Sequence, residues 1–249
     1  MGILLTIAYD GTNYAGWQKQ QNAVSVSEKL EQTLRHVLSC DIVLLGASRT
    51  DAGVHALGQR AHVKLAGQRK IPIDALPKVV NAALPRNIRV YAAKWVDDKF
   101  HPISDAVSKT YEYRICASHI ADPRRRKFVW QIYHDLDFDA MQTAAAFFVG
   151  EYDFAAFCSS GHSAKSTVRR VNYLHLTRER ADIVITINGN GFLYNMVRII
   201  AGTLVEVGEG KIAPGDIPAI IHSKNRADAG RTAPPNGLTL MEIFYEGGL

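Results

Sequence analysis

Cysteine is scarce in this chain, and the cysteines present form no recognisable pattern. The three residues Cys40, Cys116 and Cys158 lie far apart and include no C-x-x-C pair. An odd number of widely spaced cysteines predicts no disulfide framework and fits a reducing cytoplasm. The histidines are scattered without an H-E-x-x-H motif or a Cys/His cluster, so we expect neither a structural nor a catalytic metal.

Long apolar runs are also missing. None approaches the roughly 20 residues of a transmembrane helix, so we expect no association with a membrane. Residues 1–7 lack the charged region of a signal peptide and predict a first strand, which favours a cytoplasmic location. Neither a G-x-x-x-x-G-K-[ST] loop nor a strand-coupled G-x-G-x-x-G motif is present, so nothing indicates a nucleotide cofactor.

Positive charge is in modest excess. The 249 residues include 29 Lys and Arg against 24 Asp and Glu, a formal charge of +5. The basic residues gather at 124–127, 165–170 and 224–231. Such clusters suit a nucleic-acid backbone, although basic loops in water give the same pattern.

Strand and helix signals alternate along the chain. They predict strands at 3–9, 42–47, 60–66, 88–96, 109–115, 168–177, 181–188 and 238–245. They predict helices that begin at Ser25 or Ser27, near Asp74, at Asp137 or Asp139, and over 194–207 and 215–222. Hairpin-like strand pairs mixed with helices favour the α+β class over a doubly wound parallel sheet.

The two halves of the chain share a similar rhythm of elements. We predict a first half at 1–104 and a second at 105–249, which share a mostly antiparallel central sheet flanked by helices. No low-complexity linker separates them, so a ligand site between them is expected.

The most informative motif is Ser48-Arg49-Thr50-Asp51-Ala52-Gly53-Val54-His55. It lies between two predicted strands, so Asp51 sits on a short loop that can turn at Gly53. Such a loop can present one reactive carboxylate, which could act as nucleophile, base or electrostatic stabiliser. A polar turn between two strands is the simpler interpretation.

Three further groups of residues are candidates for a site. Arg198 lies within an apolar helix, where it either pairs with a carboxylate such as Asp51 or extends to the helix rim. Tyr111 and Tyr113 point to one face of a strand, to stack on bases or to pack in the core. Residues 9–20 mix glycines, aromatics and amides, as a binding loop or a structural loop would.

Together these segments resemble the TruA-type tRNA pseudouridine synthases over nearly the whole chain. The matching segments are YDGTNYAGWQKQ at 9–20, SRTDAGVHALGQ at 48–59, KTYEYRI at 109–115, NGFLYNMVRIIAGTL at 190–204 and AGRTAPPNGLTL at 229–240. One departure is Ser48, where many members have glycine before Arg-Thr-Asp. It lies outside the catalytic residues.

The resemblance implies a pseudouridine synthase fold and the isomerisation of uridine at positions 38, 39 and 40 of the tRNA anticodon stem-loop. It implies that Asp51 is catalytic, that Arg49 helps displace the target base and that Tyr111 stacks on uracil. It further implies that Arg198 pairs with the aspartate and that Leu238 lines the uracil pocket. A homodimer without metal or organic cofactor, whose subunits both contact tRNA, is expected.

Two other functions are compatible with parts of the sequence. A non-catalytic RNA-binding module would use the same basic and aromatic residues. A hydrolase of glycosidic bonds would need a second ordered carboxylate, for which Asp10 is the nearest candidate. For the isomerase, attack of Asp51 on ribose C1′, attack on uracil C6 and a glycal route all remain open.

Overall fold

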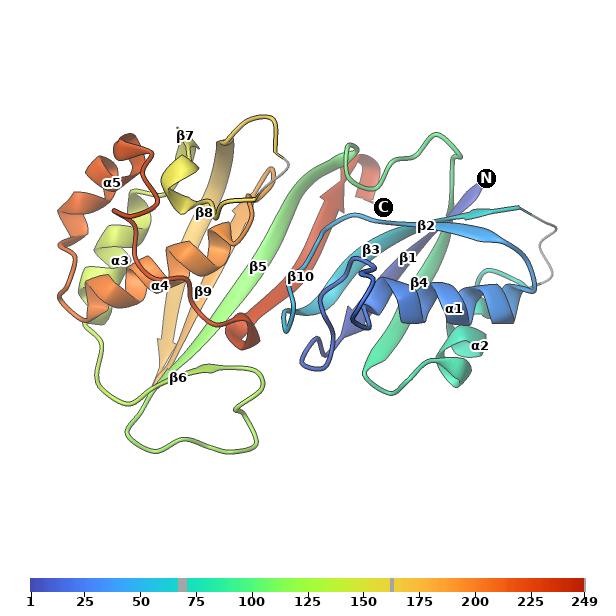
Figure 1. Ribbon diagram of the computed structural model, residues 1–249, viewed down its shortest axis with the longest axis horizontal. Coiled ribbons are helices and arrows are strands. Elements are labelled where there is room, and N and C mark those ends of the chain that lie inside the picture. The colour runs from blue at the N-terminus through green and yellow to red at the C-terminus, as the bar shows by residue number, and fades with distance from the viewer. Residues whose placement is uncertain (67–70, 162–163, 249) are drawn as a thin grey trace. The chain divides into compact units, whose positions relative to one another are not determined.

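The computed structural model describes residues 1–66, 71–161 and 164–248. It contains two compact units, Met1–Val107 with Leu240–Leu249 and Ser108–Thr239 (Figure 1). The halves 1–104 and 105–249 stay a prediction about domains. In the structure the last strand groups with the first unit.

The first unit is built on an antiparallel sheet. Its strands follow the order β4-β1-β3-β10, and β2 pairs with β3, with bounds β1 (Gly2–Tyr9), β2 (Ile42–Gly46), β3 (His55–Leu65), β4 (Ile88–Val96) and β10 (Leu238–Tyr245). Pairing is antiparallel between β1 and β3, β1 and β4, and β2 and β3. Strand β1 is buried along nearly its whole length, which explains its continuous apolar run.

Helices α1 (Val26–Leu38) and α2 (Leu76–Ala83) pack against β2 and β4 and against each other. Ser25 caps α1 as predicted, since its hydroxyl accepts a hydrogen bond from the Glu28 amide at 3.2 Å. The prediction that α2 starts at Asp74 was wrong by two residues. A turn comes first, in which the amides of Ala75 and Leu76 donate to the Pro72 carbonyl.

The start of β3 was also predicted too late. The strand begins at His55 and not near residue 60, because Ala56 and Gln59 pair with Tyr9 and Ile7 of β1. Gly58 has no side chain, so it interrupts the alternation of apolar and polar residues by which a strand is recognised. A Cβ there would meet the Met241 carbonyl oxygen of β10 at 2.2 Å, so glycine allows the two backbones to approach.

The second unit has its own antiparallel strands in the order β5-β9-β8-β7, and β6 runs parallel to β5. Their bounds are β5 (Ala106–Ala117), β6 (Trp130–Ile132), β7 (Gly150–Asp153), β8 (Val168–Glu179) and β9 (Asp182–Gly189). Its helices are α3 (Phe138–Ala146), α4 (Met196–Gly208) and α5 (Ile217–Ser223). The predicted α+β class, with a mostly antiparallel sheet flanked by helices, is confirmed.

Helix α4 is buried on nearly all sides, as its apolar sequence predicted. The segment 229–233 lies directly against it. A Cβ at Gly202 would meet the Arg231 carbonyl oxygen at 1.8 Å, and one at Gly230 would meet the Thr203 Cα at 2.6 Å. Two glycines therefore let this segment contact the helix backbone, and the Ala233 amide donates to the Arg198 carbonyl at 3.1 Å.

Candidate active site

The Asp51 loop (residues 47–54) connects β2 to β3 by a tight turn. The Val54 amide donates to the Asp51 carbonyl at 3.1 Å, and Gly53 takes a φ of +80°, which glycine adopts readily. Arg49 is exposed and Asp51 is partly exposed, whereas Thr50 between them is buried. The loop is thus a polar turn that also presents its carboxylate.

Buried polar side chains hold this loop from the sheet side. The amide of Gln59, which is fully buried, donates to the Ser48 carbonyl at 2.7 Å and accepts from the Ser48 amide at 3.2 Å. The Tyr9 and Thr50 hydroxyl groups lie 2.7 Å apart and share a hydrogen bond. The first pair of bonds fixes the backbone of Ser48, the second contact holds the Thr50 side chain, and the sequence indicated neither.

The loop at 10–25 also packs against the Asp51 loop. The Trp17 amide donates to the Thr50 carbonyl at 3.0 Å, and the Gly53 amide donates to the Tyr14 carbonyl at 3.3 Å. Gly16 has a φ of +88°, and a Cβ there would lie 2.5 Å from the Thr50 carbonyl oxygen. The glycines and aromatics of 9–20 therefore support the site structurally, and Gly16 is a residue that sequence reasoning missed.

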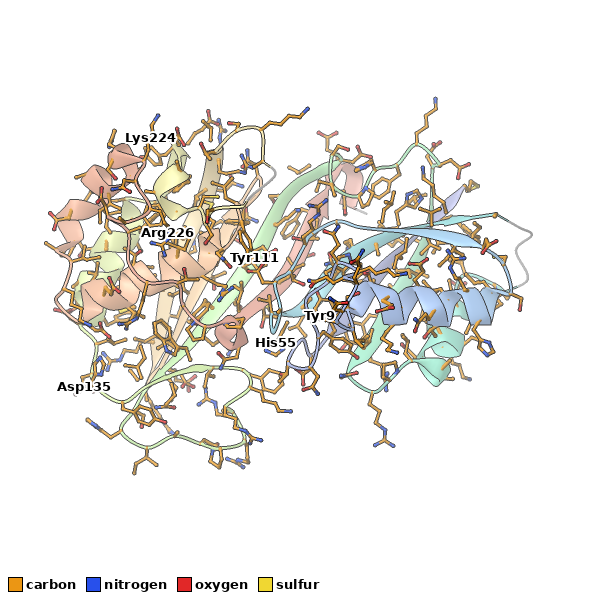
Figure 2. The ribbon with its side chains drawn as sticks, viewed as in Figure 1. Tyr9, His55, Tyr111, Asp135, Lys224 and Arg226 are labelled. Carbon is orange, nitrogen blue, oxygen red and sulfur yellow. The ribbon has the colours of Figure 1, made fainter. Side chains whose placement is uncertain are left out.

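Asp10, the alternative second carboxylate, serves a turn in this unit. Its Oδ1 accepts from the Thr12 amide at 2.9 Å and from the Thr12 hydroxyl at 2.5 Å. The same oxygen lies 3.3 Å from Nδ1 of the buried His55. The Gly11 amide donates to the same nitrogen of His55 at 3.1 Å, so Asp10 and His55 together fix the start of this loop. Figure 2 marks Tyr9 and His55 in this unit.

In the second unit, the two tyrosines of β5 have different surroundings. Tyr113 is fully buried, its hydroxyl donates to the Pro234 carbonyl at 2.7 Å, and burial raises its pKa. The ring of Tyr111 (labelled in Figure 2) meets Phe192 edge-on, with centroids 5.3 Å apart. Core packing therefore accounts for Tyr113, and Tyr111 is the better candidate for a substrate contact.

Arg198 lies in the first turn of α4 and is held by hydrogen bonds. Its Nε donates to the Ala233 carbonyl at 2.8 Å, and its Nη1 donates to the Asn195 side-chain oxygen at 2.7 Å. Its charge opposes the effect of burial on the pKa of Tyr113. These bonds orient the guanidinium, so it does not simply extend into water at the helix rim.

Leu238 is nearly buried and follows the short 3₁₀ helix Pro235–Gly237. Glycine is needed at 237, because a Cβ would meet the Tyr113 ring at 2.7 Å. Asn236 fixes the turn by donating to the carbonyls of Arg126 and Val129, at 2.9 and 2.7 Å.

The family model described as tRNA pseudouridine synthase matches residues 5–103 and 144–246. A relative from Caldicellulosiruptor bescii, named tRNA pseudouridine synthase A, is 46% identical over 98% of this chain and 99% of its own. A relative of the same name from Acetivibrio thermocellus is also 46% identical over the same shares. This chain belongs to the tRNA pseudouridine synthase family. It is therefore an isomerase, and the pseudouridine synthase fold expected from the resemblance is confirmed.

A solved structure also aligns with this pseudouridine synthase, at a low level of likeness. One chain of a Cbf5-Nop10-Gar1 complex matches 97% of this chain and 50% of its own, with 12% identity and a TM-score of 0.39. That likeness is too low to carry an argument about function.

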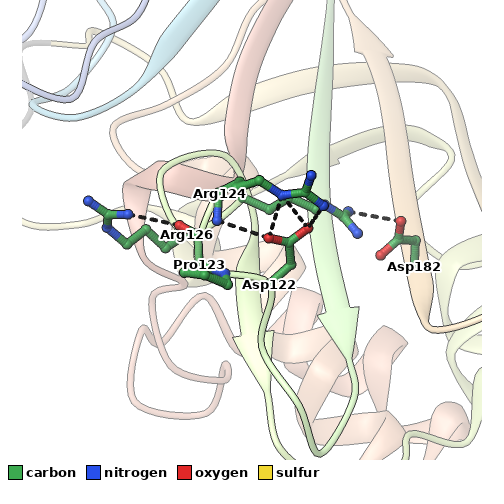
Figure 3. A network of polar contacts seen from close by, with 6 residues as sticks. Asp122, Pro123, Arg124, Arg126 and Asp182 are labelled. Atoms are coloured by element: carbon green, nitrogen blue, oxygen red, sulfur yellow. Dashed lines mark hydrogen bonds and ion pairs between the residues drawn. The ribbon is translucent and has the colours of Figure 1, made fainter.

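The basic cluster 124–127 of this pseudouridine synthase is partly neutralised within the protein (Figure 3). Arg124 forms hydrogen bonds to both carboxylate oxygens of Asp122, and Arg125 forms a 2.8 Å ion pair with Asp182. Hydrogen bonds from Arg124 hold the pKa of Asp122 at about 2. Two of the cations thus have carboxylate partners, which weakens the case for this cluster as the main RNA contact.

Within the described parts of the chain, no group of three or more His, Cys, Asp or Glu side chains is arranged to hold a metal ion. Over the same residues, no helix is long and apolar enough to cross a membrane.

Proposed function

We propose that this pseudouridine synthase isomerises uridine to pseudouridine at positions 38, 39 and 40 of the tRNA anticodon stem-loop, with Asp51 as its catalytic residue. The observation that carries the proposal is the fixed Asp51 loop. Its backbone is bonded to Gln59, Trp17 and Tyr14, while the Asp51 side chain stays partly exposed. Catalysis gains most when a reactive group is held in place before the substrate arrives.

The reaction rearranges one nucleotide without any redox change. The bond between ribose C1′ and uracil N1 breaks, the base rotates, and a bond between C1′ and C5 forms. The proton on C5 is lost and N1 gains one, so atoms and electrons balance within the substrate and water. Asp51 can take part as a nucleophile at C1′ or C6, or as the base that begins a glycal route.

The remaining roles follow from the family motifs and complete the proposal. Arg49, exposed beside the catalytic aspartate, helps keep the base out of the stem, which offsets an unstacking cost of a few kcal/mol. Tyr111 supports the uracil ring and Leu238 lines its pocket. Arg198 provides the positive charge that keeps the aspartate ionised. The active form is a cytoplasmic homodimer whose subunits both contact tRNA.

The test is tritium release from tRNA labelled at uracil C5, because C5 loses its hydrogen only when pseudouridine forms. The native chain should release tritium, and Asp51→Asn, which keeps the shape of the side chain, should lose at least a thousandfold in rate. Asp74→Asn is the matched control, since Asp74 is an exposed acid of the same unit. It should keep full activity.

Each contrary outcome names another function. Tight tRNA binding without tritium release by the native chain would indicate a binding module. Free uracil in the products would indicate a hydrolase. Equal rates for the native chain and Asp51→Asn would refute the role of Asp51.

A further inference from the structure

Asn195 precedes helix α4 in a conformation that is uncommon for a residue at the start of a helix. An asparagine there ordinarily has an extended backbone, and its side chain accepts a hydrogen bond from an amide of the first turn. Asn195 instead lies in the left-handed region, with a φ of +62° and a ψ of 5°. Within the described parts of the chain, its side chain accepts no bond from the amides of α4. The side chain therefore serves a purpose other than capping the helix.

The side chain of Asn195 joins two other side chains of the second unit. Its Oδ1 accepts from Nη1 of Arg198 at 2.7 Å, and its Nδ2 donates to the hydroxyl oxygen of Ser159 at 3.0 Å. An arginine can only donate, so the amide oxygen must face Arg198 and the amide nitrogen must face Ser159. A short bond from a charged donor is stronger than one between neutral groups, so Asn195 holds the guanidinium firmly.

Backbone groups fix this arrangement on both sides. The Ser159 amide donates to the Tyr194 carbonyl at 3.1 Å, which holds Ser159 beside Asn195. On the other side, Nε of Arg198 donates to the Ala233 carbonyl at 2.8 Å. A planar guanidinium that is bonded at two of its nitrogen atoms has its plane fixed. Asn195 supplies one of these two bonds, and Ser159 keeps Asn195 in place.

We propose that Asn195 is a positioning residue, which orients the guanidinium of Arg198 for its pairing with Asp51 and is itself held by Ser159. The inference rests on the proposed function, in which the charge of Arg198 keeps the aspartate ionised. A guanidinium and a carboxylate pair best through two parallel N–H···O bonds, so the orientation of the guanidinium matters as well as its charge. A left-handed backbone at a residue other than glycine is a form of strain that proteins retain at functional sites.

The substitution Asn195→Gly tests the inference, because glycine adopts a positive φ without strain and lacks the side-chain amide. It should lower kcat for tritium release about ten- to thirtyfold, the factor expected when an arginine side chain regains its rotamer freedom. KM for tRNA should change little, since Arg198 acts in the chemical step. Ser159→Ala removes only the outer bond, so it should cause a smaller loss of kcat in the same direction.

The pH dependence of the rate separates positioning from a merely structural role. A misdirected guanidinium stabilises the charged form of Asp51 less well, so the pKa of that carboxyl should rise. The acid limb of kcat/KM reports the free enzyme, and in Asn195→Gly it should move to higher pH. Arg198→Met removes the charge altogether and should move the limb further, by about 1–3 pH units. A structural defect alone would lower stability without moving the limb.

Nuclear magnetic resonance reads the orientation of the guanidinium without any substrate. In the native chain with isotopically labelled arginine, restricted rotation should give Arg198 separate Nη1 and Nη2 signals, which Arg198→Lys would assign by their loss. In Asn195→Gly the guanidinium should rotate, and the two signals should merge. Asn195→Asp should keep them separate, because a carboxylate oxygen accepts from a guanidinium at least as well as an amide oxygen does.

Ser39→Gly is the matched control. Ser39 is an exposed, uncharged residue at the end of α1, and its φ of +52° is also positive. The control should leave kcat, the acid limb and the Arg198 signals as they are in the native chain. Thermal unfolding of every variant shows whether a loss of rate comes from a loss of folded protein.

Two results would overturn the inference. One is a native acid limb and native Arg198 signals in Asn195→Gly. The other is merged Arg198 signals with a native kcat and acid limb, which would mean that the reaction does not depend on this orientation.

Tritium release by the native chain tests the proposed function separately. If the native chain releases tritium and Asn195→Gly behaves as Ser39→Gly does, the function stands and the inference fails. If the signals merge in Asn195→Gly but the native chain releases no tritium, Asn195 orients Arg198 and the isomerase is refuted.

Discussion

The substitution Gly16→Ala should reduce catalysis far more than it reduces stability. An added Cβ would lie 2.5 Å from the Thr50 carbonyl oxygen, whereas ordinary van der Waals contact begins at 3.4 Å. The Asp51 loop must therefore move by roughly 0.9 Å, or the Trp17 amide must release the same carbonyl. A displacement of about 1 Å can cost a hundredfold in rate, so we expect kcat to fall between ten- and a hundredfold.

The stability change has a separate source. A non-glycine residue at the φ of +88° costs about 1–2 kcal/mol, and this cost would arise wherever such a glycine is replaced. Gly210→Ala is the control, because Gly210 has a φ of +71° and nothing within 4 Å of its ideal Cβ. Both variants should melt several degrees lower, and only Gly16→Ala should lose activity in the tritium assay. Equal activities would refute the argument that Gly16 positions the Asp51 loop.

Two further predictions concern polar contacts. Tyr9→Phe leaves the buried Thr50 hydroxyl without its partner at 2.7 Å. The free energy of unfolding in urea should therefore fall by about 1–2 kcal/mol, and kcat should fall a few-fold. A variant as stable as the native chain would contradict this prediction. For Glu209, burial raises the pKa, but hydrogen bonds from Arg231 and Lys211 outweigh it and lower the pKa from 4.5 to about 2. Its contribution, about 3 kcal/mol at most, is present above pH 4.5 and lost as pH falls toward 2. Glu209→Gln should therefore have a lower free energy of unfolding in urea at pH 7 than the native chain, and that free energy should fall less between pH 5 and pH 3. If the pH dependence of the variant matched that of the native chain, the ion pairs of Glu209 would not be its cause.

The local elements were largely predictable because each depends on nearby residues. The cap at Ser25 and the buried face of α1 follow from side-chain hydrogen bonding and helical periodicity. The turn after Asp51 follows from the freedom of Gly53 at positive φ. Element boundaries were predicted wrongly where pairing with segments distant in the sequence sets them. Strand β3 extends back to His55 because β1 pairs with it.

The sequence by itself determined the α+β class, the turn that carries Asp51 and the family motifs, since periodicity, turn chemistry and residue order are written along the chain. Only the tertiary structure decided what holds that turn, because Tyr9, Gly16 and Gln59 reach it from other segments. It likewise separated Tyr111 from Tyr113, which share a strand face. Hydrogen bonding and side-chain packing join residues that are distant in the sequence, so their effects appear only once the chain is folded.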